Sequence, residues 1–167
     1  MNKYLGLIFL AIFLVACNTS QETKKPTQNT VSTIDAKKKL TETDKQKLIQ
    51  KGYKIIDFID PKTKDTILMQ QYFMAFLKKG KNRSHNTKQA DSLQRLHLAH
   101  LKRMYDLGYA DISGPFGDLG DIRGITIYNV PTIEMADSLA NSDPMVKAGR
   151  LEIEMHPWWA GKGLPLR

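Results

Sequence analysis

Two histidines lie three residues apart in a stretch of the sequence that has helical periodicity. From about Thr87 to Leu107 the apolar residues recur at the spacing of one helix face, and His97 and His100 fall within that stripe. The stripe consists of Leu93, Leu96, His97, His100, Leu101 and Met104. Because side chains three positions apart share a helix face, the two imidazoles are candidates for proton transfer or for metal binding. The alternative for each is a core histidine with satisfied hydrogen bonds and no chemistry.

The elements around this helix predict an α+β fold. Gly108 marks the end of the helix, and from Thr66 onward the predicted order is strand, helix, strand, strand, helix, strand. The strands cover 66–77, 109–113, 122–130 and the segment after Gly149, and the second helix opens at Pro131-Thr132. This is the split βαβ order of a ferredoxin-like βαββαβ fold. Right-handed crossovers then place both helices on one face of the sheet.

The first strand of this fold, 66–77, is apolar on both faces. After Gln71 one alternating set is Tyr72, Met74 and Phe76, and the other is Phe73, Ala75 and Leu77. Because a strand buried on both faces needs a cover on each side, we expect a homodimer in which the sheet face opposite the helices meets a second copy of the chain. Trp158 and Trp159 are expected to cover a sheet edge or to join this contact. The alternative is a surface on which a ligand stacks.

A further helix and strand are predicted before this fold, in residues 44–65. The helix runs from Asp44 to Lys51, with Thr41 or Thr43 as its N-cap and Gly52 as its left-handed stop. β-branched and aromatic residues at 53–59 and turn residues at 60–65 follow it. This pattern predicts a hairpin with the strand at 66–77.

The front of the chain has the pattern of a targeting segment. Residues 1–16 read as a signal peptide, with an apolar run at 5–15 that is too short for a transmembrane helix. Leu14-Val15-Ala16-Cys17 resembles the lipobox of bacterial lipoproteins, which implies that Cys17 is acylated and becomes the mature N-terminus. Residues 17–43 are expected to be a flexible tether. We expect a lipid-anchored protein of the cell envelope that faces the periplasm or the exterior. The alternative is an ordinary cleavage site beside an incidental cysteine.

Composition and spacing argue against several other functions. The net charge is +8, but the basic residues form no strongly basic block, so nucleic acid is not an expected partner. Cys17 is the one cysteine, which excludes an internal disulfide. The glycines at 114, 117, 120 and 124 lie between predicted strands with no helix N-terminus after them, so they do not form a phosphate-binding loop. No cofactor is expected.

A set of short motifs runs through the second half of the chain. It consists of His97-Leu98-Ala99, Gly108, Gly114-Pro115, ANSDPMVKAG at 140–149, and Pro157-Trp158. In order and spacing, this segment from Tyr72 to Gly163 resembles the YCII-related family. The resemblance implies a ferredoxin-like domain at 66–164 that pairs as a dimeric α/β barrel. It also implies an active site of one histidine and one aspartate, at His97 and Asp143, and some members of the family are isomerases or lyases of small ring compounds.

Helix lengths indicate that His97 and Asp143 lie at the same level. At about 1.5 Å per residue, His97 stands roughly 15 Å before the first helix ends, and the second helix is about 15 to 17 Å long from that same end of the sheet. A carboxylate at this level could fix the imidazole tautomer and raise the basicity of the ring. Asp143 before Pro144 also has the pattern of a helix N-cap, either alone or combined with a role in the site.

Two further side chains are candidates for substrate binding. His100 lies one turn after His97, and Arg123 could orient an anionic substrate from the sheet. The alternatives are a structural histidine and a solvated arginine. His97, His100 and Asp143 could also form an open metal site, but no clear fourth ligand accompanies them, and no metal is expected.

The sequence therefore leads to two expectations of function. The first is an acid–base enzyme of the isomerase or lyase type that acts on a small polar molecule, with His97 moving the proton and Asp143 orienting it. The second is a non-catalytic module that binds a small ligand or a protein through the same cleft or through the Trp158-Trp159 surface.

Overall fold

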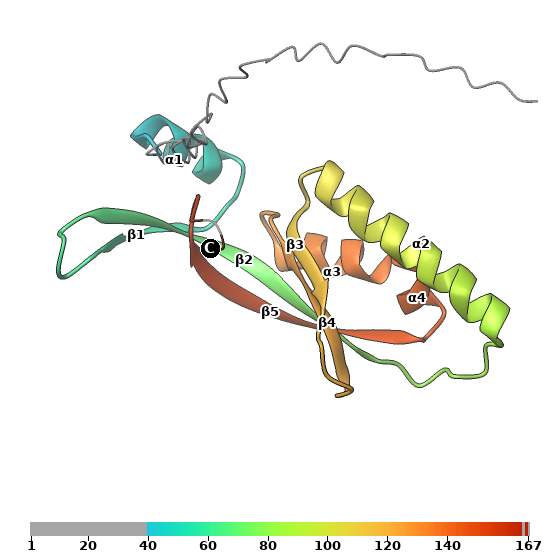
Figure 1. The fold of residues 1–167 in the computed structure, drawn as a ribbon. Helices are drawn as coiled ribbons and strands as arrows, with labels where there is room; N and C mark the ends of the chain where they lie inside the picture. Colours follow the sequence, from blue (N-terminus) through green and yellow to red (C-terminus); the bar gives the residue numbers. More distant parts are fainter. Residues whose placement is uncertain (1–39, 165, 167) are drawn as a thin grey trace, which may run out of the picture. The chain divides into compact units, whose positions relative to one another are not determined.

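The computed structural model describes residues 40–164 and 166 of the 167-residue chain. The predicted signal peptide 1–16, Cys17 and the predicted tether up to residue 39 lie outside the described residues. The elements are α1 (Glu42–Gln50), β1 (Ile55–Ile59), β2 (Thr66–Lys79), α2 (Thr87–Asp106), β3 (Ala110–Pro115), β4 (Ile122–Tyr128), α3 (Ile133–Asn141), α4 (Pro144–Lys147) and β5 (Leu151–Gly161) (Figure 1). Within the described part of the chain, no helix is both long enough and apolar enough to span a bilayer.

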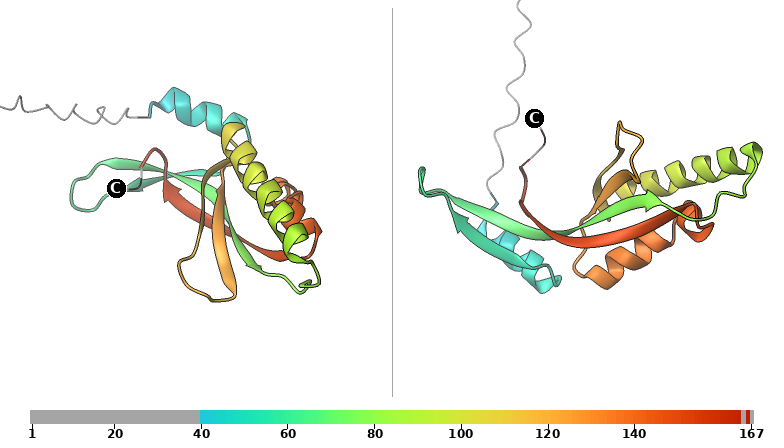
Figure 2. Two further views of the ribbon diagram at one scale, coloured as in Figure 1. Left: turned by 45° about the vertical axis from the view of Figure 1, so that its right-hand side comes forward. Right: turned by 90° about the horizontal axis from the view of Figure 1, so that it is seen from below.

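The strands form one antiparallel sheet around the long strand β2. β5 pairs with β2 along 69–79, and β4 pairs with the second half of β2 on its other side, followed by β3. The order β5-β2-β4-β3 is that of a ferredoxin-like fold, so the predicted α+β, ferredoxin-like class is confirmed. β1 pairs with the first part of β2, which confirms the predicted hairpin. Figure 2 shows this hairpin reaching beyond the part of the sheet that α2 and α3 cover.

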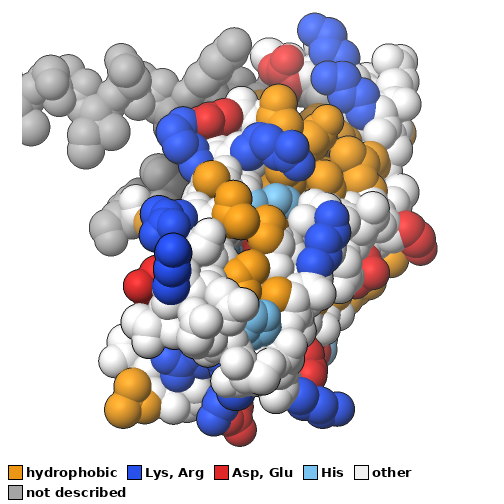
Figure 3. Space-filling model, turned by 90° about the vertical axis from the view of Figure 1, so that its right-hand side faces the viewer, with side chains coloured by type: hydrophobic (Ala, Val, Ile, Leu, Met, Phe, Trp, Pro, Cys, Tyr) orange, Lys and Arg blue, Asp and Glu red, His pale blue; other side chains and the backbone are white. Residues whose placement is uncertain are grey.

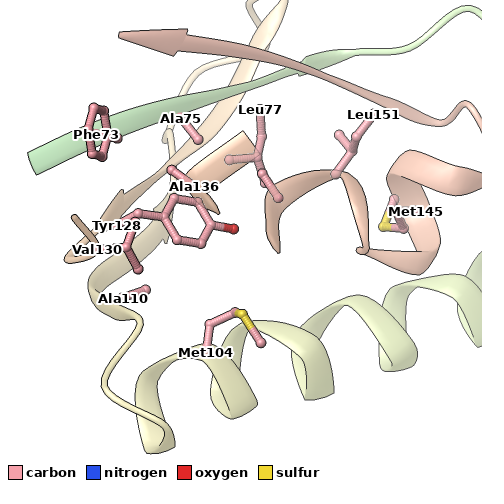
Figure 4. Close-up of a cluster of buried hydrophobic side chains, with 11 residues drawn as sticks. Phe73, Ala75, Leu77, Met104, Ala110, Tyr128, Val130, Ala136, Met145 and Leu151 are labelled. Carbon is pink, nitrogen blue, oxygen red and sulfur yellow. The ribbon is translucent and has the colours of Figure 1, made fainter. Parts of the chain in front are cut away.

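The core lies between the sheet and the helices. Phe73, Ala75 and Leu77 of β2 share one buried cluster with Met104 of α2, and Ala136 and Ala140 of α3 belong to the same cluster. Both helices therefore pack on one face of the sheet, as right-handed crossovers require. Figure 4 shows the side chains of Ala75 and Leu77 directed from the strand toward the helical layer.

The first helix begins earlier than the sequence predicts. α1 starts at Glu42 rather than Asp44, because Thr41 and Asp44 form a capping box. The Thr41 hydroxyl accepts the Asp44 N–H at 3.2 Å, and the Asp44 carboxylate accepts the Thr41 N–H at 3.0 Å. Gly52 has a φ of +85°, so the predicted left-handed stop is confirmed.

Leu96 does not belong to the buried face of α2, contrary to the prediction. It is 51% exposed, whereas His97, His100 and Met104 are buried. Successive residues in a helix are rotated by about 100°, so Leu96 lies outside the helix face that carries His97 and packs against the sheet. Apolar spacing alone placed it in the stripe.

The sheet face opposite the helices is apolar but only partly covered. Tyr72 and Ile127 are buried on it, while Met74 and Phe76 keep part of their surface exposed. Trp158 lies directly across from Tyr72 on the paired strand, with ring centres 6.1 Å apart. An apolar face that stays partly exposed is the kind of surface through which the subunits of a homodimer pack together.

Candidate active site

The helix that carries His97 is fixed at both ends by local chemistry. Asn86 caps α2 by accepting the Gln89 N–H at 3.0 Å, and the Gln89 side chain accepts the Asn86 N–H at 3.0 Å. At the other end Gly108 adopts a φ of +72°. His97 lies on the face of α2 that packs against α4 and the sheet, and it is 8% exposed.

Asp143 reaches His97 from the short link between α3 and α4. Oδ2 of Asp143 lies 2.6 Å from Nδ1 of His97, so the predicted proximity of the two residues is confirmed. Oδ1 accepts the backbone N–H of Met145 at 2.7 Å, and Pro144 occupies the first turn of α4. The aspartate therefore caps a helix and binds the imidazole at the same time, which restricts rotation of its carboxylate.

The charge of Asp143 fixes the tautomer of the ring. Burial alone would raise the pKa of Asp143, but the hydrogen bond and charge of His97 and the Met145 N–H lower that pKa below its ordinary value. An ionised carboxylate only accepts, so Nδ1 of His97 must carry the hydrogen, and Nε2 of the neutral ring keeps a free lone pair. Nε2 has no hydrogen-bond partner within the described residues, and it is not one of their fully buried, unpartnered atoms.

His97 borders a cavity of about 430 Å³ between α2, the β3–β4 hairpin and the start of β5. Its apolar walls include Leu98 and Leu101 of α2 and Met145 of α4. Figure 3 shows one face of the molecule on which histidine side chains reach the surface among apolar side chains, with Lys and Arg side chains on either side. A proton acceptor at the edge of a small, partly apolar cavity is the arrangement that general acid–base chemistry requires.

Three arginines border the same cavity. Arg123, which the sequence identified as a candidate, lies at the start of β4, and its Nη1 donates to the carbonyl of Gly120 at 3.0 Å. Arg83 and Arg150 were missed by the sequence analysis. No signal in the sequence marks them, because only the pairing of Lys79 with Leu151 in the folded sheet places the loop after β2 beside the start of β5.

His100 does not join this cavity. It is buried one turn beyond His97, and its Nε2 is enclosed without a hydrogen-bond partner. Burial lowers the pKa of His100, the charge of Asp143 partly opposes that effect, and Arg103 and His97 add to it. The structure therefore places His97, Asp143 and Arg123 around one site and leaves the second predicted binding residue, His100, behind it.

No group of three or more His, Cys, Asp or Glu side chains in residues 40–164 and 166 has the arrangement of a metal site. Nδ1 of His97 faces the carboxylate of Asp143, and Nε2 of His100 is buried in the protein interior. The alternative of a metal centre at His97, His100 and Asp143 therefore has no supporting geometry in the described residues.

A larger cavity, of about 780 Å³, lies away from this chemistry. It is bordered by α1, the β1–β2 hairpin and the residues after β5, including the ion pair of Lys45 with Asp57. It contains neither histidine nor arginine. We place the candidate site at the smaller cavity because that cavity adjoins His97, whose ring orientation is restrained by Asp143.

No protein-family model matches the sequence, and no curated protein matches it. Among solved structures, the chain is similar to a 5-chloro-2-hydroxyhydroquinone dehydrochlorinase from Burkholderia phenoliruptrix AC1100, in complex with 2,5-dihydroxybenzoquinone. The sequence identity is 20%, the TM-score is 0.40, and the match covers 52% of this chain and 92% of that chain. A likeness of that degree carries no conclusion about activity. The fold assignment rests on the strand order, and the resemblance to the YCII-related family stays a prediction.

Proposed function

We propose that the cavity beside His97 is a general acid–base site that moves a proton on a small polar molecule, in a reaction of the isomerase or lyase type. The observation that carries the proposal is the 2.6 Å contact of Nδ1 with Asp143, which leaves Nε2 as the free acceptor at the cavity. The resemblance to the YCII-related family, where a histidine and an aspartate are the implied pair, supports the same assignment.

In the proposed reaction Nε2 takes a proton from a carbon or hydroxyl of the substrate, and the electron pair of the broken bond stays on the substrate. The ring becomes an imidazolium, which the Asp143 carboxylate stabilises. In an isomerisation Nε2 returns the proton to another atom of the same molecule. In an elimination the retained electron pair expels a leaving group, and the imidazolium protonates it.

Exchange with deuterium tests this proposal without knowledge of the complete reaction. The full-length protein and its His97→Gln variant are incubated in D2O with a library of small metabolites that contain acidic C–H bonds. Mass spectrometry then detects substitution of deuterium for hydrogen. We expect exchange with the wild-type protein and at least a hundredfold slower exchange with the variant, because a positioned base contributes about 10²- to 10⁴-fold.

Circular dichroism of the variant checks that its fold is retained. A compound that binds and raises the melting temperature, but neither exchanges nor changes chemically, would favour the competing function, a non-catalytic binding module. Equal exchange by both proteins would contradict the proposal outright.

We propose further that the protein works as a homodimer at the surface of a membrane, in the cell envelope. The lipobox-like segment that ends at Cys17 supports an acylated N-terminus, and two or three acyl chains would hold the protein on a bilayer facing the periplasm or the exterior. Cys17→Ser tests this part. We expect the variant to move from the membrane to the soluble fraction and to lose the mass of the acyl groups, and retention of both would contradict the anchor.

A further inference from the structure

The cavity beside His97 has three positive side chains and no negative one. Arg83, Arg123 and Arg150 all border it, and none of its lining residues is an aspartate or a glutamate. None of the three forms an ion pair within the described residues. A cluster of like charges around one small volume repels itself, and an anion in that volume relieves the repulsion.

The backbone forces two of these arginines together. The loop after β2 is bound to the turn before β5 through the Gly80 N–H and the Arg150 carbonyl, at 2.9 Å, and through the Asn82 N–H and the Gly149 carbonyl, at 2.9 Å. A Cβ on Gly80 would lie 2.3 Å from the Gly149 carbonyl oxygen, so only glycine permits this crossing. Arg83 follows within that loop, so its backbone lies close to this turn, and both its side chain and that of Arg150 border the cavity.

Arg150 also has an unmet hydrogen-bonding requirement. Its Nε is fully buried and has no acceptor within the described residues. A buried donor on a charged group is costly when it has no partner. The two Nη atoms of Arg150 are not among the fully buried atoms and have no hydrogen-bond partner in the described residues, so an oxyanion in the cavity would bind there. Arg123 is already partly engaged through Nη1, whose hydrogen bond to the Gly120 carbonyl restrains the side chain at the cavity.

We propose that this cavity binds a small organic oxyanion, with its charged group against Arg150, Arg83 and Arg123 and its uncharged end against the leucines of α2. The inference rests on the proposed function, since it names the substrate class of the same site. A carboxylate at the arginine side leaves the neighbouring carbon toward Nε2 of His97. The volume of about 430 Å³ suits a molecule at the small end of the range for ligand pockets.

Side-chain NMR of the full-length protein tests this inference. The arginine Nε signals are followed while succinate, inorganic phosphate or the neutral analogue succinamide is added. We expect succinate to shift the Arg150 Nε signal in a saturable way, and succinamide to leave it unchanged. Saturable binding of phosphate alone would assign the site to phosphorylated molecules rather than carboxylates and would overturn the proposed ligand.

Variants separate this inference from the catalytic proposal. Arg150→Gln, or Arg123→Gln if the first variant fails to fold, is expected to weaken succinate binding at least tenfold. Arg95→Gln removes the same charge from the exposed side of α2, outside the cavity lining, and is expected to bind as the wild type does. His97→Gln is also expected to retain binding while it loses exchange. If the wild-type protein itself bound succinate but catalysed no exchange, the anion site would stand and only the proposed base would be rejected. Unchanged binding by Arg150→Gln, or equal shifts with succinamide, would overturn the inference.

Discussion

His97 and Asp143 meet across 46 positions of the chain, with 2.6 Å between Nδ1 and Oδ2. The aspartate reaches this position because it is also the N-cap of α4, where it accepts the Met145 N–H at 2.7 Å. One carboxylate therefore links the start of a helix to His97, the proposed base of the site. Replacing it should disturb both stability and chemistry, and suitable variants can separate the two effects.

Asp143→Ala removes the cap and leaves the Nδ1–H of His97 without an acceptor. We expect a loss of about 2 to 4 kcal/mol in the free energy of unfolding. Asp143→Asn keeps an oxygen for Met145 and should lose less. Chemical denaturation of the two variants at pH 7 measures the difference, and equal losses would contradict a separate capping role.

The charge of Asp143 adds a pH dependence to that measurement. Its pKa in the folded protein lies below the ordinary value of 3.8, so its stabilisation is present above pH 3.8 and is lost as the pH falls through the lower folded value. The difference in stability between wild type and Asp143→Asn should therefore shrink in acid. If the difference in the free energy of unfolding stayed constant down to a pH at which Asp143 is fully protonated, the ionisation of Asp143 would not be coupled to stability.

His100 is expected to make the protein less stable as the pH falls below 6.5. Burial lowers its pKa in the folded state, so the unfolded chain takes up the proton first and stability declines from about pH 6.5 downward. His100→Leu should remove this part of the pH dependence and also the enclosed Nε2 that has no partner. Thermal melts between pH 5 and 8 compare the two proteins. A variant with the wild-type slope would show that His100 does not titrate in this way.

Gly80→Ala should destabilise the crossing between the loop after β2 and the turn before β5. The added Cβ would lie 2.3 Å from the Gly149 carbonyl oxygen, so the backbone must shift at a cost of about 1 to 3 kcal/mol. Gly117→Ala is the matched control, because a Cβ there meets nothing within 4 Å. Denaturant midpoints should fall for the first variant and not for the second, and equal midpoints would contradict the close approach.

Met74→Glu tests the expected homodimer. Met74 lies on the sheet face opposite the helices and is only partly buried, so a charge there should oppose contact with a second copy. Light scattering of the full-length protein in detergent should give a dimer mass for the wild type and a monomer mass for the variant. Leu96→Glu, on the exposed side of α2, should remain a dimer. A wild-type monomer would reject the dimer.

The sequence predicted the fold well where local patterns and topology agree. Alternating residues in β2 and the stop at Gly108 follow from local chemistry, and the ferredoxin-like order follows from the sequence of elements. The meeting of His97 with Asp143 was also predictable, because two helices with known rise start from opposite ends of the same layer. Those features depend on neighbours in the chain or on element length.

Features that depend on packing were not predictable in the same way. Leu96 has the right spacing for the buried stripe, but the width of the packed face is set by the sheet beneath it. Arg83 and Arg150 lie in segments that read as ordinary polar loops, and only the pairing of β2 with β5 brings them together. Recognition of the basic cavity therefore required the three-dimensional structure.

The central claim is that Asp143 holds His97 with its proton on Nδ1 and leaves Nε2 free at the cavity. Nitrogen NMR of the imidazole ring in the full-length protein tests it most directly, at a pH where the ring is neutral. We predict the Nδ1–H tautomer in the wild type, its loss in Asp143→Asn, and a shift of the Nε2 signal when succinate is added. A ring protonated on Nε2 in the wild type, or one unaffected by Asp143→Asn, would contradict the account.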